Sequence, residues 1–355
     1  MHGNFRNNSG SWASPVTEEK FQGAAIGSFG EYDTAMDIHG AFFAGVKYDE
    51  EVNKDILLFT SAKGPSFELS EFSKLSSTNA NANTPQIITD GSGKIFVLWN
   101  EVLDGNRKKK IATKSSTDEV WDVTTVNDSS DSGFVGYFES IAASENGSII
   151  TAWQHGNGDG EDKTKILASY IPHGGGLENV VNTFISKPSG NAYYPEVKMD
   201  NDGNALVIWR FSDGKNYRIQ AAYRSNSVDS KWSAPVDISA EGFDAVHTNG
   251  SQLGEKNGSS IAFDSNGNAQ VVWTVNEEGL YRIQTAEFNA ENVSWSTPVT
   301  VSQHVNSEGN VLPLSNAQLP SIVIDTDGAG TIAWQQVAST GISQVLVSRK
   351  TAGSG

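Results

Sequence analysis

The sequence predicts an all-β fold, a six-bladed β-propeller with four antiparallel strands in each blade. Three observations support this prediction. A glycine-containing turn followed by an apolar strand recurs six times along the chain. Each recurring unit of about 50 residues carries the pattern of four short strands, as propeller blades do. The outer-strand pattern that the last unit lacks occurs at the N-terminus instead.

The repeat consists of an Asp-x-x-Gly turn and an apolar strand that ends in tryptophan, nine residues after the aspartate. Its copies are Asp90 with Trp99, Asp200 with Trp209, Asp264 with Trp273, Asp325 with Trp334, the degenerate Ser144 with Trp153, and Asp37 with Val46 in the place of tryptophan. Aspartate and glycine suit a tight turn, because aspartate bonds its own backbone and glycine tolerates a positive φ. We expect the tryptophans to pack between blades.

The unit around Asp200 shows the four expected strands most clearly. The first covers residues 196–199, the second 205–209, the third 217–223 and the fourth 232–239. The second is almost continuously apolar, which is typical of a strand buried on both faces. The fourth contains Pro235, which suits an outer edge strand because a missing N–H is tolerated there.

The outer-strand pattern Trp-x-x-Pro-Val predicts how the ring closes. It occurs at Trp232 and Trp295, and its counterpart after Trp334 would fall near residue 356, beyond the last residue. The same pattern stands at Trp12 to Val16. We therefore expect the N-terminal strand, residues 12–17, to complete the last blade and remove its open edge. The prediction is a single propeller domain over residues 12–350, with flexible termini at 1–11 and 351–355.

Composition excludes several classes of function. The chain of 355 residues has 42 acidic and 25 basic residues and a formal charge of −17, which disfavours nucleic acid as a partner. The basic run at residues 107–110 is predicted to be a solvated strand edge. There is no cysteine and no apolar stretch long enough to span a membrane. We expect a monomer that is secreted or held in a bacterial cell envelope, with no cleavable leader visible in the sequence.

The repeat resembles that of bacterial sialidase-like propellers with Asp-box repeats. The likeness extends from about Trp12 to Lys350, although the spacing of glycine and tryptophan differs from that of the usual Asp box. The resemblance implies the propeller fold. Sialidase chemistry would also require three arginines around a carboxylate, but no arginine lies between residues 7 and 106, and only Arg210 is expected at the mouth. Sialidase activity is therefore not expected.

Candidate site residues lie on the face that carries the loops between blades. One polar set consists of the residues that follow the repeat tryptophans: Lys47, Asn100, Gln154, Arg210, Thr274 and Gln335. A second set consists of the residues four positions before the repeat aspartates: Asp33, Gln86, Ser140, Glu196, Ser260 and Ser321. Loops on a rigid scaffold commonly bind ligands. The predicted ligand-binding set is Asn100, Tyr137, Gln154, Tyr193, Glu196, Arg210, Phe243 and Gln335.

The sequence favours a non-catalytic propeller that binds a carbohydrate or a partner protein at this face. The first alternative is a glycoside hydrolase or lyase with two carboxylates drawn from Asp33, Glu139 and Glu196, and the second is a purely structural interaction module. The Asp-x-Asp/Asn-Gly segments and the acidic loop at 156–162 invite a calcium site. They are interpreted as turns and a flexible loop, so neither a metal nor a cofactor is predicted.

Overall fold

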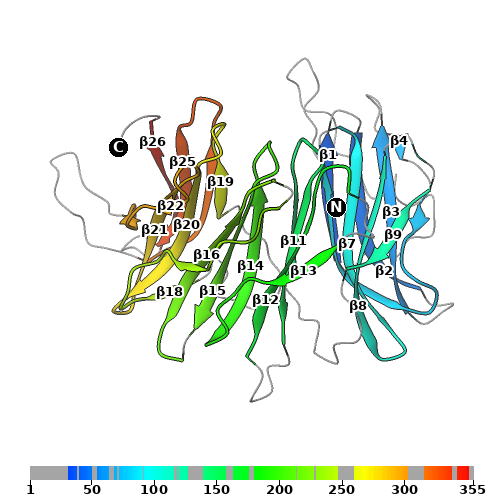
Figure 1. Ribbon diagram of the computed structural model, residues 1–355, viewed down its shortest axis with the longest axis horizontal. Coiled ribbons are helices and arrows are strands. Elements are labelled where there is room, and N and C mark those ends of the chain that lie inside the picture. Colours follow the sequence, from blue (N-terminus) through cyan, green and yellow to red (C-terminus); the bar gives the residue numbers. More distant parts are fainter. Residues whose placement is uncertain are drawn as a thin grey trace. The chain divides into compact units, whose positions relative to one another are not determined.

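A computed structural model describes most of the chain, in the ranges 31–37, 40–49, 54–63, 68–69, 72–90, 92–115, 118, 120–126, 139–156, 163–175, 180–212, 214–227, 229–246, 260–302, 316–337 and 342–351. Every regular element in these ranges is a β-strand (Figure 1). None of the described segments forms a helix that is long and apolar enough to cross a membrane. The chain divides into two compact units, Met1–Ser132 and Gly133–Gly355, which are described one at a time.

The first unit holds two antiparallel sheets. Sheet 1 consists of β1 (Glu31–Asp37), β2 (Gly40–Asp49), β3 (Lys54–Lys63), β4 (Glu68–Leu69) and β5 (Ser73–Lys74). Sheet 2 consists of β6 (Asn81–Thr89), β7 (Lys94–Leu103), β8 (Asn106–Ser115) and β9 (Asp122–Thr125). In both sheets the strands pair in chain order, and β4 and β5 both pair with β3 as two pieces of one outer strand.

The second unit holds four more antiparallel sheets. Sheet 3 consists of β10 (Ser140–Ala143), β11 (Ile149–His155), β12 (Lys165–Ile171) and β13 (Val181–Phe184), and sheet 4 of β14 (Asn191–Met199), β15 (Ala205–Ser212), β16 (Tyr217–Arg224) and β17 (Val236–Asp237). Sheet 5 consists of β18 (Asp244–Val246), β19 (Ile261–Phe263), β20 (Ala269–Glu277), β21 (Leu280–Asn289), β22 (Ser294–Trp295) and β23 (Val299–Thr300), and sheet 6 of β24 (Ala317–Ile324), β25 (Gly330–Val337) and β26 (Ser343–Lys350). The predicted all-β class is confirmed, and sheets 2, 3 and 4 have the predicted four antiparallel strands.

The repeat aspartates form hydrogen-bonded turns between the first and second strands. Asp200 Oδ1 accepts the amide of Asn204 at 2.8 Å, and Gly203 has a φ of +92° that favours glycine. Asp264 Oδ1 accepts the amides of Asn266 and Asn268 at 2.8 and 2.9 Å. The side-chain oxygens therefore satisfy turn amides, as the sequence predicted.

Four of the repeat tryptophans, Trp99, Trp209, Trp273 and Trp334, lie in the packing between neighbouring sheets of one unit. Trp99, Trp153, Trp209 and Trp273 are 0–1% exposed, and Trp334 is 5% exposed. Trp209 packs among residues of sheets 3 and 4, and Trp273 among residues of sheets 4 and 5. The indole N–H of Trp209 donates to Gln220 Oε1 at 3.1 Å, so its one polar atom is satisfied in the core.

The assignment of Val46 to the tryptophan position is wrong. In sheet 4, Glu196 pairs with Ile208, the residue before Trp209. In sheet 1 the corresponding Asp33 pairs with Ala44, so the residue in the tryptophan's place is Gly45. The cause is a shorter turn, because Asp37 pairs directly with Gly40 and leaves two residues between them. A change of one residue moves every following side chain to the other face.

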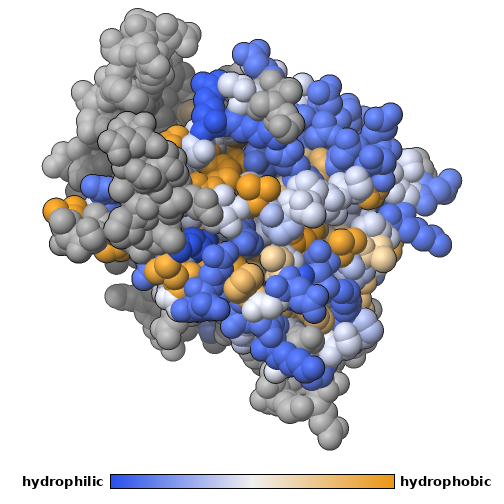
Figure 2. All heavy atoms as spheres, turned by 90° about the vertical axis from the view of Figure 1, so that its left-hand side faces the viewer, coloured by the Kyte–Doolittle hydropathy of each residue, from blue (hydrophilic) through white to orange (hydrophobic). Residues whose placement is uncertain are grey.

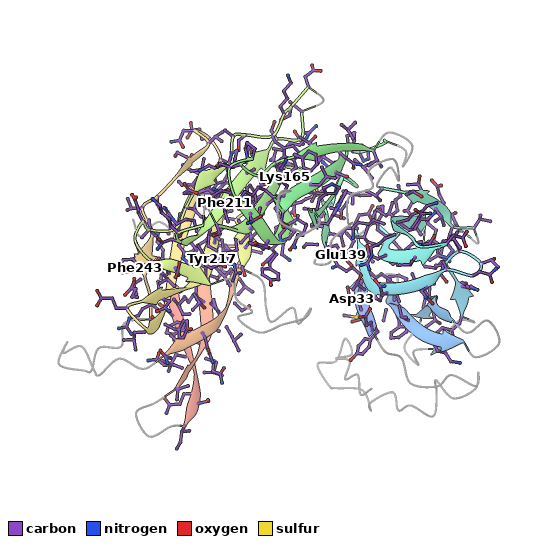
Figure 3. The ribbon with its side chains drawn as sticks, turned by 90° about the horizontal axis from the view of Figure 1, so that it is seen from below. Asp33, Glu139, Lys165, Phe211, Tyr217 and Phe243 are labelled. Carbon is purple, nitrogen blue, oxygen red and sulfur yellow. The ribbon has the colours of Figure 1, made fainter. Side chains whose placement is uncertain are left out.

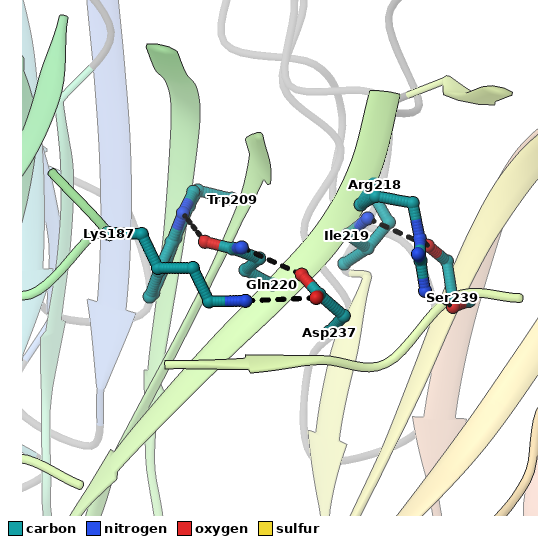
Figure 4. A network of polar contacts seen from close by, with 7 residues as sticks. All are labelled: Lys187, Trp209, Arg218, Ile219, Gln220, Asp237 and Ser239. Atoms are coloured by element: carbon teal, nitrogen blue, oxygen red, sulfur yellow. Dashed lines mark hydrogen bonds and ion pairs between the residues drawn. The ribbon is translucent and has the colours of Figure 1, made fainter. Parts of the chain in front are cut away.

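Outer strands are shorter than predicted and are fixed by serine side chains. In sheet 4 only Val236–Asp237 pairs as a strand, and the following Ser239 Oγ accepts the amide of Ile219 at 3.0 Å (Figure 4). In three other sheets a serine Oγ likewise accepts a backbone amide: Ser76 from Leu57, Ser186 from Ile166, and Ser302 from Ile283. A buried serine thus ends the outer strand in four of the sheets.

The predicted closing strand, residues 12–17, lies outside the described residues. Among those that are described, β26 pairs only with β25 and forms the edge of sheet 6.

Candidate functional site

A β-bulge with a strained backbone occurs in the first strand of sheets 2, 4 and 6. The bulges lie between Asn83 and Gln86, between Tyr193 and Glu196, and between Gln318 and Ser321. Each contains a non-glycine residue with positive φ: Thr84 at 50°, and Tyr194 and Leu319 at 54°. Bulges re-aim side chains and are frequent beside binding and catalytic sites.

The bulges share the sequence Asn-Ala-x-x-Pro, which the sequence analysis missed. It begins at Asn81, Asn191 and Asn316. The asparagine carbonyl of Asn191 accepts the amide of Thr164 at 2.9 Å, and that of Asn316 accepts the amide of Tyr281 at 3.0 Å. The asparagine side chain thus joins the start of the first strand of its own sheet to the third strand of the preceding sheet. A search for a repeated proline near the first strand would have found the motif.

The bulge of sheet 4 lies beside Arg210, at the end of the sheet where β15 ends and β16 begins. The Arg210 guanidinium carbon is 4.1 Å from the ring centre of Tyr217, 5.3 Å from that of Tyr194 and 5.7 Å from that of Tyr193. Arg210 is half-buried, and its buried Nε has no hydrogen-bond acceptor among the described residues. Nor does any described carboxylate form an ion pair with it. We call these four residues the arginine–tyrosine cage.

Two further interactions define the chemistry of the cage. Burial raises the pKa of the Tyr193 phenol, and neighbouring Tyr217 raises it further. The charge of Arg210 lowers this pKa, but the net effect is a raised pKa. The backbone amide of Tyr217 donates to Asp244 Oδ1 at 2.8 Å, which fixes the start of β16. Figure 3 views this end of the molecule and labels Tyr217. The cage therefore presents a fixed positive charge next to a phenol that stays protonated.

The predicted ring of polar residues before the repeat aspartates joins neighbouring sheets within each unit. Glu196 Oε1 accepts the amide of Ser260 at 2.8 Å, and Ser140 Oγ accepts the amide of Val197 at 3.2 Å. In the first unit, Asp33 Oδ2 accepts the amide of Ile87 at 3.0 Å. These side chains thus hold the first strands of adjacent sheets together, which gives Asp33 and Glu196 a structural role.

Asn100 is fully buried, and it takes part in a polar network of the first unit. Its Nδ2 donates to Thr84 Oγ1 at 2.6 Å, and its Oδ1 accepts from Lys109 Nζ at 2.7 Å. Lys109 is 0% exposed, which contradicts the prediction that the basic run 107–110 is solvated. The lysine is buried because it lies opposite Asn100 in the β7–β8 register and finds its acceptor there.

The remaining predicted site residues lie apart from the cage contacts. Gln154 is half-buried, with its Oε1 unpaired among the described residues. Gln335 Oε1 is 3.5 Å from Gln318 Nε2. Phe243 packs against the core between sheets 4 and 5, and Tyr137 lies outside the described residues. Of the predicted set, the structure brings Tyr193 and Arg210 into contact, and it adds Tyr194 and Tyr217.

Comparison with known proteins shows likeness in structure alone. No protein-family model and no curated protein sequence matches the chain. Among solved structures, it is similar to the polysaccharide lyase Uly1, with a TM-score of 0.48 and 10% identity over 89% of this chain and 76% of that one. It is also similar to the neuraminidase-like protein N11 of an influenza A virus from a flat-faced bat, with a TM-score of 0.44 and 9% identity over 91% and 88%.

A third similar structure is an α-L-arabinofuranosidase from Fusarium graminearum, with a TM-score of 0.40 and 13% identity over 91% of this chain and 93% of that one. The chain thus resembles sialidase-like and arabinanase-like β-propellers in fold. Most of these matches are enzymes that act on glycans. This finding contradicts the interpretation of the chain as a non-catalytic binding propeller, and with it the expectation that it is not an enzyme.

Proposed function

We propose that the chain is an enzyme that cleaves an acidic polysaccharide at the arginine–tyrosine cage of sheet 4. The observation that supports this most strongly is the guanidinium of Arg210, which contacts three tyrosine rings but has no carboxylate partner among the described residues. Guanidinium groups bind carboxylates in a bidentate manner. In a chain of net charge −17, this isolated cation is a specific place for a sugar carboxylate.

The cage suits β-elimination at a uronate residue. In this reaction Arg210 holds and neutralises the carboxylate, and a base removes the proton from the adjacent ring carbon. The electron pair left there forms a carbon–carbon double bond as the glycosidic C–O bond breaks. The leaving oxygen then takes a proton from an acid. We assign the acid to Tyr193, whose raised pKa keeps it protonated, and the base to Tyr217, the ring nearest to the guanidinium.

Hydrolysis by paired carboxylates has less support from the geometry. It needs two carboxyl groups on either side of the glycosidic bond, about 5–10 Å apart. Two of the three candidates, Asp33 and Glu196, already accept backbone amides of the neighbouring sheet. The cage supplies a cation and phenols in their place. Elimination is therefore the reaction that its residues support better.

We further propose that the sheets are the six blades of one closed propeller over residues 12–350, with the N-terminal strand as the outer strand of the last blade. The support is the repeated register of sheets 2 to 6 and the fact that β26 pairs only with β25 among the described residues. A secreted or envelope location would give such an enzyme access to polysaccharides outside the cell.

Incubation of the purified chain with uronate polymers tests the proposed activity. Pectate, alginate and hyaluronan serve as acidic substrates, and arabinan and neutral galactan serve as controls. We expect new reducing ends together with the ultraviolet absorbance of an unsaturated uronate on at least one acidic polymer. Reducing ends without that absorbance indicate hydrolysis. Cleavage of neutral polymers only, or of none, contradicts the proposal.

A further inference from the structure

A pocket of about 580 Å³ lies between sheets 5 and 6, at the end opposite the arginine–tyrosine cage. It opens where the Asp-Gly turns and the ends of the third strands lie. Its walls include residues from both sheets: Gln270, Glu287, Phe288 and Trp295 from sheet 5, and Ile324, Gly330 and Lys350 from sheet 6. Both sheets belong to the second unit.

The same place between sheets 4 and 5 is filled by a tryptophan of the outer strand. Trp295 packs there with Phe288 at 5.2 Å between ring centres, and Phe288 in turn lies 4.8 Å from Tyr223. Leu206 and Phe263 belong to the same cluster. Between sheets 3 and 4, the outer-strand residue Trp232 packs in the same manner, against a cluster that contains Tyr170 and Met199.

Strand register shows that the pocket is the equivalent of these two places. Ala269 pairs with Phe263 and Phe288, and Gly330 pairs with Ile324 and Lys350. Counting along the repeat, Leu206 corresponds to Gln270, and Tyr223 to Glu287. The pocket walls are thus the counterparts of the residues on which Trp295 packs, one sheet further along the chain.

The first unit shows how a lysine at the position of Lys350 receives such a tryptophan. Lys114 pairs with Ile95, five residues after the repeat aspartate, as Lys350 pairs with Gly330. Lys114 Nζ lies 5.1 Å from the ring centre of the outer-strand residue Trp121. A cation over an indole ring is favourable. In the pocket, Lys350 Nζ is 2.6 Å from Glu287 Oε1, and its stem lines the wall.

The edge of sheet 6 has a complementary outer-strand position. In sheet 4, Gln220 and Ala221 of the third strand pair with Asp237 and Val236 of the outer strand. In sheet 5, Gln284 and Thr285 pair with Thr300 and Val299. The counterparts in β26 are Leu346 and Val347. Figure 2 views the side on which sheet 6 lies and shows apolar patches among polar atoms, and Val347 is 62% exposed.

We propose that the pocket is the binding site for Trp12, and that residues 12–17 pair with β26 so that Val16 lies opposite Val347 and Thr17 opposite Leu346. The spacing supports this register, because Val236 follows Trp232 by four residues, Val299 follows Trp295 by four, and Val16 follows Trp12 by four. This inference rests on the closed ring proposed above. It adds the site, the occupant and the register.

Disulfide formation in the full chain tests the register, since the natural sequence contains no cysteine. Directly opposed residues of antiparallel strands are about 4.5–5.5 Å apart between Cα atoms, which a disulfide can join. We expect the Val16→Cys/Val347→Cys variant to form an intrachain disulfide under mild oxidation. The matched control Ser14→Cys/Val347→Cys, which is shifted by two residues, should retain free thiols.

Three outcomes overturn the proposal, and none depends on catalytic activity. A disulfide in the control pair means that the ring closes in another register. A disulfide between two chains means that a second copy supplies the strand. Free thiols in both variants mean that this strand does not pair with β26 at all. As a second measurement, Trp12→Ala should lower Tm by an amount similar to Trp295→Ala, and an unchanged Tm contradicts the site.

Discussion

The guanidinium carbon of Arg210 lies 4.1 Å from the ring centre of Tyr217, and that of Arg224 lies 4.0 Å from the ring centre of Tyr170. The two distances are nearly equal, but the contacts lie at opposite ends of sheet 4. Arg224 lies in the packing between sheets 3 and 4, and its guanidinium also donates to the carbonyl of Ser225 at 2.8 Å. Arg210 has two further tyrosines beside it, and its Nε has no hydrogen-bond acceptor within the part of the chain that the structure describes. The Arg224 contact is therefore structural, whereas the Arg210 contact is suited to a ligand.

Replacement of the proposed acid tests the role of Tyr193. A phenol that must be protonated supports activity until the pH rises through its pKa, and burial raises this pKa above the usual value of 10.0. We expect Tyr193→Phe to lower kcat by about 100-fold or more. We expect kcat of the natural chain to decline at strongly alkaline pH, and Tyr193→Phe should lose that decline. A variant that keeps both kcat and that decline would assign the acid elsewhere.

The polar network around Asp237 predicts a pH-dependent stability. Burial raises the pKa of Asp237, but hydrogen bonds from Lys187 and Gln220, at 2.9 and 2.7 Å, and the charges of Lys187 and Arg218 outweigh this and lower it (Figure 4). A pKa that is lower in the folded chain stabilises the fold above about pH 4, the usual value of an unfolded aspartate. This contribution disappears as the pH falls through the folded pKa.

Asp237→Asn should therefore lower Tm at neutral pH and have a smaller effect below about pH 4. Thermal unfolding followed by circular dichroism across this range measures the difference. Asp229→Asn, in an exposed loop before the same strand, is the control and should leave Tm nearly unchanged at both ends of the range. An equal loss at all pH values for Asp237→Asn would mean that its charge does not contribute.

The buried pair Asn100 and Lys109 predicts a non-additive effect on stability. Ile219 and Ile283 lie at the position equivalent to Lys109 in sheets 4 and 5. Lys109→Ile therefore introduces the residue found there, but it leaves Asn100 Oδ1 without its lysine donor. We expect a loss of about 1–3 kcal/mol in the free energy of unfolding. Asn100→Thr/Lys109→Ile copies the Thr274 and Ile283 pair and should recover part of it. Denaturant unfolding of these two variants and of Asn100→Thr alone measures the coupling, and additive losses would contradict it.

Local patterns allowed the core and turns to be predicted from the sequence. The Asp-Gly turns and the tryptophan positions depend on residues within one hairpin, and the structure confirms them for Trp99, Trp209 and Trp273. The first repeat failed, because its turn is shorter and shifts Gly45 into the place assigned to Val46. Such a shift depends on strand register, which the weak repeat at Asp37 does not fix.

The site was only partly predictable for the same reason. Arg210 and Tyr193 were placed at one end of the fold by strand direction alone. Tyr194 was overlooked as a site residue because its role depends on a positive φ that residue type does not reveal, and Tyr217 because it appeared as one residue of an alternating strand. Lys109 was taken for a surface lysine, since its buried partner Asn100 lies on another strand.

The most direct test of the account compares Arg210→Gln with Arg224→Gln on the uronate polymer that the natural chain cleaves. Loss of a charged hydrogen bond of about 1.5–3 kcal/mol corresponds to roughly a 10- to 100-fold change. We predict that Arg210→Gln lowers kcat/KM by at least this factor with little change in Tm. Arg224→Gln should lower Tm and leave kcat/KM of the folded chain within about twofold. If Arg210→Gln cleaves the polymer as fast as the natural chain does, the cage is not the active site.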